Sequence, residues 1–251
     1  MQALIAYHED IDPAGALVNI AGVPDTMLNV NGDNITIPGA LPHIIGEACL
    51  IDDASGVAAR IQSPSLRIIS NLDVEPIVVG AAVFGSPPEG LMHPLNPTPV
   101  VPDEFLEYLC NSNPAAVEVH YGLVWLSDGP QAPVNGNIYT LRATAAIQQT
   151  VATWTPGNMV FGQDLPVGRY QVVGLRVRST DAVAARLLFH GAAWRPGVPV
   201  VNAIGDLDSR WFRYGRMGVF GEFDHNLPPQ LEMLGGVAAA QVVLMDLIKV
   251  G

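Results

Sequence analysis

The stretch that decides the fold runs from Leu165 to Val198 and reads LPVGRYQVVGLRVRSTDAVAARLLFHGAAWRPGV. Apolar residues occupy every second position in both of its halves, namely Val173, Leu175 and Val177, and then Val183, Ala185, Leu187 and Phe189. This period of two is typical of strands with one buried face. The polar residues Ser179 to Asp181 lie between the halves, so the stretch predicts a hairpin of two strands.

Three arginines share the predicted outward side of this hairpin. Arg176 and Arg178 alternate with the apolar residues of the first strand, and Arg186 does so in the second. Like charges side by side on a sheet repel one another. We therefore expect acidic groups against these arginines, either from the same chain or from a neighbouring subunit.

The composition indicates a surface that is partly covered by other subunits. Of the 251 residues, 49% are hydrophobic and 14% are charged, whereas soluble domains have about 25% charged residues. A chain with so few charges has difficulty covering its own surface, which favours burial against neighbouring subunits. The alternative is a large domain whose surface is polar but uncharged.

The charge balance argues against a nucleic-acid-binding surface. The net charge is −12 and Lys249 is the single lysine, whereas a nucleic-acid surface needs a basic patch. The apolar runs 77–85 and 235–245 are shorter than the roughly 20 residues of a membrane span. The N-terminus lacks the features of a signal peptide, so we expect synthesis and assembly in a cytoplasm.

Abundant turn residues predict an all-β chain. The 25 glycines and 21 prolines are scattered, which suits many strands joined by tight turns. We expect strands at 2–7, 16–21, 27–30, 34–37, 43–51, 57–61, 66–70, 75–84, 117–126, 138–151, 159–161, 198–203 and 237–250. A helix is the alternative for 138–151, and Asn31-Gly32-Asp33 predicts a hairpin turn.

Two segments interrupt the strands. Residues 85–102 contain six prolines, which predicts a long connection and a candidate arm towards a neighbouring subunit. Asp103–Asn111 predicts the one short helix, with Asp103 as its N-cap. The whole pattern predicts one jelly-roll-like β-sandwich domain over residues 1–251.

Catalytic and metal-binding signatures are weak in this sequence. Glu118 and His120 would share a strand face, and Glu222, Asp224 and His225 read as a polar turn. Asp206 and Asp208 lie near Trp211, a pattern that also occurs where sugars bind. Cys49 and Cys110 have apolar neighbours and predict buried free thiols. We expect no catalytic residue, cofactor or metal.

A second arginine-rich segment completes the predicted interface. Arg210, Trp211 and Arg213 alternate basic and aromatic side chains, which protein–protein interfaces enrich. The candidate subunit contacts are therefore Arg176, Arg178, Arg186, Arg210, Trp211 and Arg213.

Part of the chain resembles a known family. The runs LPVGRYQVVGLRVRS and AARLLFHGAAWRPGVPVV, with the corner Trp194 to Val198 and the earlier Ser63-Pro64-Ser65-Leu66-Arg67, are similar to jelly-roll capsid proteins of icosahedral tailless viruses. The resemblance covers about a third of the chain. It implies a structural subunit that assembles into a virion with copies of itself and with other capsid proteins, without enzymatic activity. The alternative is a carbohydrate-binding or glycan-hydrolysing β-sandwich that uses Trp194 and Trp211.

Overall fold

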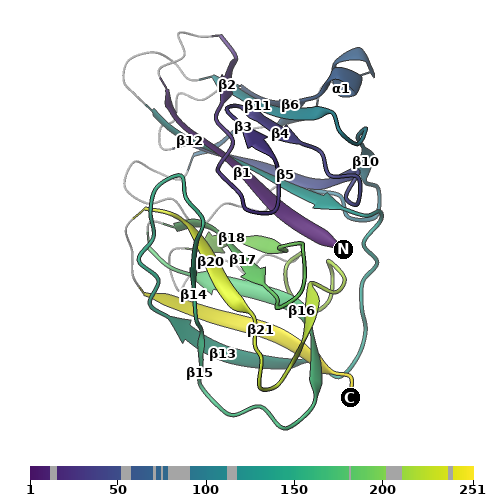
Figure 1. Cartoon of the computed structure of the whole chain (residues 1–251), viewed down its shortest axis with the longest axis vertical. Helices are drawn as coiled ribbons and strands as arrows, with labels where there is room; N and C mark the ends of the chain where they lie inside the picture. Colours follow the sequence, from purple (N-terminus) through teal and green to yellow (C-terminus); the bar gives the residue numbers. More distant parts are fainter. Residues whose placement is uncertain are drawn as a thin grey trace.

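The computed structural model consists almost entirely of strands (Figure 1). It describes residues 1–11, 16–51, 58–69, 72–74, 76–78, 91–111, 118–180, 182–201, 211–236 and 240–251. Within these ranges the chain forms 21 strands and one short helix. The all-β, sandwich-like fold predicted from the sequence is confirmed. None of the described helical segments is long and apolar enough to cross a membrane.

The N-terminal part of the chain forms two sheets, which we call the outer and the inner sheet (Figure 1). The outer sheet contains β2 (Val18–Ile20), β3 (Val30–Asn31), β4 (Asn34–Thr36), β6 (Ala58–Gln62), β7 (Leu72–Val74) and β11 (Phe105–Asn111). The inner sheet contains β1 (Gln2–Ile11), β5 (His43–Ile51), β8 (Pro76–Val78), β9 (Leu91–Met92), β10 (Thr98–Pro99) and β12 (Glu118–Ser127). Its centre is the antiparallel array β1–β12–β5.

The C-terminal part forms a single nine-stranded sheet. Its members are β13 (Tyr139–Ala145), β14 (Thr155–Gly157), β15 (Val160–Phe161), β16 (Arg169–Arg178), β17 (Ala182–Leu188), β18 (Gly197–Val201), β19 (Gly221–Asp224), β20 (Gln230–Gly235) and β21 (Gln241–Lys249). Strand β18 pairs antiparallel with β17 and parallel with β16. It thus joins a β14–β20–β17 half, which lies next to the inner sheet, to a β16–β21–β13 half at the far end of the molecule (Figure 1).

The inner sheet is buried on both faces, and this makes it the centre of the stack. Val124 and Leu126 of β12 belong to a core shared with the outer sheet. Leu123 and Trp125 belong to a second core that extends through the C-terminal sheet. The Trp125 indole Nε1–H donates to the Gly197 carbonyl oxygen at 2.8 Å, which ties the two parts together. The assignment of 1–251 as one domain stays a prediction.

The two strands of the opening stretch form as predicted, but the predicted hairpin is wrong. Strand β16 pairs with β18, β19 and β21, whereas β17 pairs with β18 and β20. Ser179 therefore begins a crossover between the two halves of the sheet. The described side chains of β17 from Ala182 to Leu187 are all buried. Alternation identifies strands, but it does not identify the partner of a strand that is buried on both faces.

The predicted helix at Asp103–Asn111 is wrong, because this segment is strand β11. Leu106, Tyr108 and Cys110 are buried in the core between the outer and inner sheets. Strand β11 pairs with β2, β4 and β6. Asp103 has a φ of 67°, which is a turn conformation and not that of an N-cap. Pairing on both sides outweighs the weak local helix preference.

The one described helix lies where a strand was predicted at 66–70. Helix α1 spans Pro64–Ile69. The Ser63 Oγ accepts a hydrogen bond from the Leu66 N–H at 3.2 Å, so Ser63 is the N-cap and Pro64 the first helical residue. Glu104 Oε2 accepts further bonds from the Ser65 N–H and hydroxyl, at 3.0 and 2.7 Å.

The described part of the proline-rich connection does not reach outwards. Strands β9 and β10 both pair with β5. The His93 ring Nε2 lies 3.0 Å from Glu47 Oε2, whose residue is fully buried, and this hydrogen bond raises the pKa of His93. Residues 91–102 thus pack against β5 of the same chain. Residues 85–90 lie outside the described residues.

The remaining strand predictions hold in most of the described residues, whereas most of the predicted strand 75–84 lies outside them. Strand β5 has the predicted bounds, and β13 confirms a strand within 138–151. Strands β3 and β4 form the predicted hairpin around Gly32, whose φ of 64° suits a tight turn. Strand β1 continues beyond the predicted end at residue 7 to Ile11, because its whole length pairs with β12.

Candidate functional site

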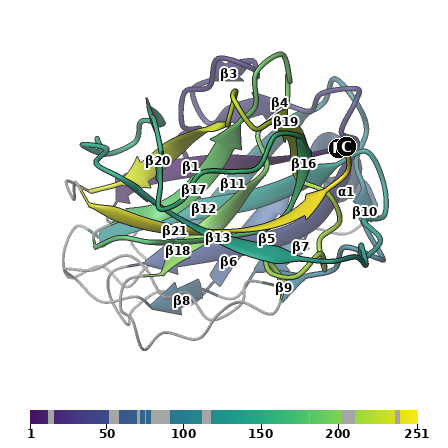
Figure 2. The ribbon, with the colours of Figure 1, turned by 90° about the horizontal axis from the view of Figure 1, so that it is seen from below.

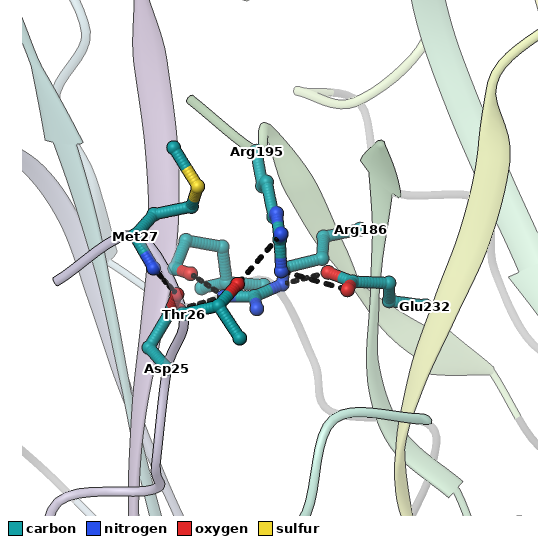
Figure 3. A network of polar contacts seen from close by, with 7 residues as sticks. Asp25, Thr26, Met27, Arg186, Arg195 and Glu232 are labelled. Carbon is teal, nitrogen blue, oxygen red and sulfur yellow. Dashed lines mark hydrogen bonds and ion pairs between the residues drawn. The ribbon is translucent and has the colours of Figure 1, made fainter. Parts of the chain in front are cut away.

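A buried arginine cluster joins the N-terminal part to the C-terminal sheet (Figure 3). Arg186 lies at its centre on β17, with a residue exposure of 1%. Its Nε–H donates to Glu232 Oε2 of β20 at 2.6 Å, and its Nη1 pairs with the carboxylate of Asp25. The same nitrogen donates to the Leu4 carbonyl at 3.3 Å. One guanidinium therefore contacts three segments that are distant in sequence.

A second arginine completes the charge balance of this cluster. Arg195 Nη1 donates to Glu232 Oε1 at 2.7 Å, and Arg195 Nη2 donates to the Thr26 hydroxyl at 2.8 Å (Figure 3). The Arg186 guanidinium carbon also lies 4.0 Å from the centre of the Trp154 ring. Two guanidinium groups and two carboxylates thus neutralise each other. This arrangement offsets the cost of burying charge and fixes the position of residues 25–27.

Arg213 forms a separate buried ion pair. Its Nε–H and Nη2–H donate to the two carboxylate oxygens of Asp246 at 2.8 and 3.0 Å. The Tyr214 N–H and the Thr140 hydroxyl donate to the same carboxylate, both at 2.8 Å. Burial alone would raise the pKa of Asp246, but these hydrogen bonds hold it below its ordinary value. The pair anchors the loop 211–217 over the end of the sheet.

The acidic partners of Arg186 and Arg213 therefore belong to the same chain. Both side chains are too buried to reach a neighbouring subunit. Arg176 and Arg178 are half-buried, and Trp211 is half-buried against the second core. A subunit contact through these three residues stays a prediction. Arg210 lies outside the described residues.

Arginines and aliphatic side chains share the outward side of the β16–β21–β13 half. Arg142, Leu244 and Arg176 are paired across neighbouring strands in one row. The next row contains Val160, Thr144, Val242 and Arg178. The residues that alternate with these on each strand belong to the second core, so both rows face away from it. We call Arg142, Val160, Arg176, Arg178, Val242 and Leu244 the arginine face.

The histidine and carboxylate groupings form separate pairs. His120 Nε2 lies 3.7 Å from Glu118 Oε2, which confirms that the two share a strand face. Burial lowers the pKa of His120 to about 4. Glu222 lies on β19 and pairs with Arg169 at 2.6 Å. Among the described residues, no group of three or more histidine, cysteine or acidic side chains is placed to hold a metal ion.

Both cysteines are buried free thiols, as predicted. Burial raises the pKa of Cys49 to about 12 and raises that of Cys110 as well. Both groups therefore stay protonated at neutral pH, which disfavours their reaction as thiolates.

The two tryptophans considered for sugar binding do not form one platform. Trp194 packs against the core of the N-terminal sheets, whereas Trp211 packs against the second core. Asp206 and Asp208 lie outside the described residues. The carbohydrate alternative stays a prediction.

Sequence reasoning missed several members of these clusters. Asp25, Arg195 and Glu232 join Arg186 from separate segments, and no local spacing connects them. Arg142 carried a signal, because it alternates with Leu141 and Ala143 in a segment already predicted as a strand. Its outward position follows from that alternation.

Comparisons with known proteins leave the family open. No protein-family model matches the chain, and no curated protein matches it. Two solved structures cover the whole chain at low similarity. A Paenibacillus xanthan lyase is 11% identical with a TM-score of 0.25, and the match spans 25% of that enzyme. The major capsid protein P2 of bacteriophage PM2 is 10% identical with a TM-score of 0.24, and 98% of it is covered. At these TM-scores neither likeness carries an argument about function, although the all-β fold is compatible with the resemblance to capsid proteins.

Proposed function

We propose that this chain is a structural subunit that assembles with copies of itself into a shell of the viral capsid class. Large apolar side chains on the surface carry the proposal. Phe105, Tyr139, Val160 and Val167 are 50%, 59%, 68% and 76% exposed. Only 36 of the 251 residues are charged, and contacts with other subunits would remove such apolar area from water.

The interior of the molecule supports a structural role. Stacked sheets share a continuous second core, and the neutral arginine cluster joins segments from both parts. A close-packed stack of this kind holds its outer surfaces in a fixed relative position. Fixed surfaces suit a subunit that repeats the same contacts around a closed shell. Its partners would be copies of itself and other capsid proteins, and its location the virion.

Electron microscopy of the purified chain tests this function. We expect closed particles of uniform size, together with light-scattering masses well above the 26.6 kDa of one chain. The double substitution Tyr139→Ser and Val167→Ser should reduce particle formation, because it removes exposed apolar area without touching the core. A stable monomer at every accessible concentration would refute the proposal.

A further inference from the structure

The two parts of the chain differ strongly in charge. Residues 1–127 contain 15 acidic and 2 basic side chains, which gives a net charge of −13 with neutral histidines. Residues 128–251 contain 9 acidic and 10 basic side chains, a net charge of +1. The net charge of −12 thus belongs to the N-terminal part. Since the C-terminal part is nearly neutral overall, attraction between two copies depends on where its basic side chains cluster.

The outward side of the outer sheet is both acidic and apolar. On β11, Phe105, Glu107 and Leu109 alternate with core residues and therefore face away from the core. Phe105 is 50% exposed, and Glu107 and Leu109 are half-buried. Asp33 of the β3–β4 turn accepts a hydrogen bond from Asn19, the residue that pairs with Leu109, and the exposed Asp103 precedes Phe105 by two residues. We call Asp33, Asp103, Phe105, Glu107 and Leu109 the acidic face.

The carboxylates of the acidic face affect a tyrosine in the core beneath it. The Tyr7 hydroxyl donates to the Leu106 carbonyl of β11 at 2.7 Å. The pKa of Tyr7 is raised well above its ordinary value, first by burial and then by the negative charges of Glu107 and Asp33. The two carboxylates therefore act together on one region of the outer sheet.

The arginine face lies at the other end of the stack. The outer sheet forms the upper end of the molecule in Figure 1, and β13 and β21 form the lower end. Figure 2 views that lower end, with β21 and β13 in front of the other strands. Arg142 is exposed, and within the described part of the chain neither Arg142 nor Arg178 forms an ion pair. Val160 adds an apolar side chain that is 68% exposed.

We propose that the arginine face of one copy binds the acidic face of a second copy, so that subunits associate head to tail. The inference rests on the proposed assembly function and specifies its contact. The arginine face carries basic and apolar side chains, whereas the acidic face carries three carboxylates and apolar side chains beside one basic residue, Arg60, which pairs with Leu109. Guanidinium groups pair with carboxylates in short, charge-assisted hydrogen bonds. Val160, Val242 and Leu244 would cover Phe105 and Leu109.

Head-to-tail contacts have a defined consequence for assembly. The two faces differ, so each copy keeps one face of each kind for a further neighbour. Such heterologous contacts close into rings when the rotation between copies allows, and otherwise continue into filaments. A ring of this kind is a building block for a larger shell.

Charge reversal with mixing tests the contact. One variant carries Arg142→Glu and Arg178→Glu, and a second carries Asp33→Lys and Glu107→Arg. Each alone has two ends of like charge, so we expect self-association to weaken at least about tenfold. An equimolar mixture should regain association, because each reversed face then meets a complementary one. Sedimentation velocity measures all three samples, and circular dichroism checks that each variant is folded.

A matched control separates this contact from general charge effects. Arg169→Glu with Lys249→Glu changes the net charge by the same amount as the first variant, at exposed positions outside the arginine face. We expect this control to associate like the unmodified chain.

Four results would overturn the proposal. Unchanged association of the folded single variants would refute the contact while leaving assembly intact, and so would failure of the mixture to recover. If Arg142→Glu with Arg178→Glu left association unchanged but abolished binding to phosphatidylserine vesicles, an anionic surface would be the occupant instead. A monomeric unmodified chain would refute both the contact and the proposed function.

Discussion

At the residue scale, Arg186 has the largest predicted effect on stability. It is paired with both Glu232 and Asp25 in a buried site. Arg186→Met would keep most of the side-chain volume but leave two buried carboxylates with less compensation. We expect the free energy of unfolding to fall by about 3–5 kcal/mol, measured by urea denaturation. The matched change at the exposed Arg216 should cost less than about 0.5 kcal/mol. A loss below about 1 kcal/mol for Arg186→Met would show that the cluster does not stabilise the contact between the two parts of the chain.

His120 gives a second residue-scale prediction, in the pH dependence of stability. Its pKa is lowered from 6.5 to about 4, first by burial and then by the neighbouring His8. Between these values the unfolded chain binds a proton that the folded chain does not. Stability should therefore fall as the pH falls from about 6.5 towards 4, by up to about 1.4 kcal/mol per pH unit from this group.

The variant His120→Gln isolates that contribution. Asp10 lies close to His8, and Glu118 lies close to His120. The pKa of Asp246 is lowered, so this group takes up its proton at lower pH. Chemical denaturation at a series of pH values should give a shallower slope for His120→Gln than for the unmodified chain or for His190→Gln at an exposed site. An identical slope in all three would contradict the assignment.

At the element scale, the packing of β12 against β11 depends on one glycine. A Cβ at Gly122 would lie 2.7 Å from the ring of Tyr108, closer than side chains allow. Gly122→Ala should lower the free energy of unfolding by about 1–3 kcal/mol through overpacking. Gly39→Ala is the control, because its Cβ would meet its nearest neighbour at an ordinary 4.0 Å. Equal denaturation midpoints for the two variants would argue against this close contact.

The elements also show how far sequence patterns reach. Strand β5 and the β3–β4 hairpin follow from alternation and an Asn-Gly turn, because those signals are local. Strand β11 was mistaken for a helix, since Phe105, Leu106 and Leu109 fit a helical stripe as well. Its pairing with β2, β4 and β6 decides the outcome, and those strands are distant in sequence. Helix α1 has a recognisable start at Ser63-Pro64, but the sequence pattern predicted a strand at 66–70.

The candidate site was harder to predict than the strands. Sequence identified the arginines, and alternation placed Arg176 and Arg178 on the outward side of their strand. Sequence patterns could not show that Arg186 pairs with Asp25, which lies more than half of the chain away. The low charged fraction predicted contacts with other subunits. The sequence also shows that its two halves differ in charge, but only the structure shows that the outer sheet and the strands β13 and β21 lie at opposite ends of the stack (Figure 1).

At the scale of the whole molecule, the central claim is self-association of a rigid stack through unlike ends. Sedimentation velocity of the unmodified chain over a range of protein concentrations, at low and high salt, tests it most directly. We predict that the weight-average sedimentation coefficient rises with protein concentration, and that added salt shifts this rise to higher concentrations, because salt screens charges at the contact. A single species of 26.6 kDa at every concentration and salt level would contradict the account.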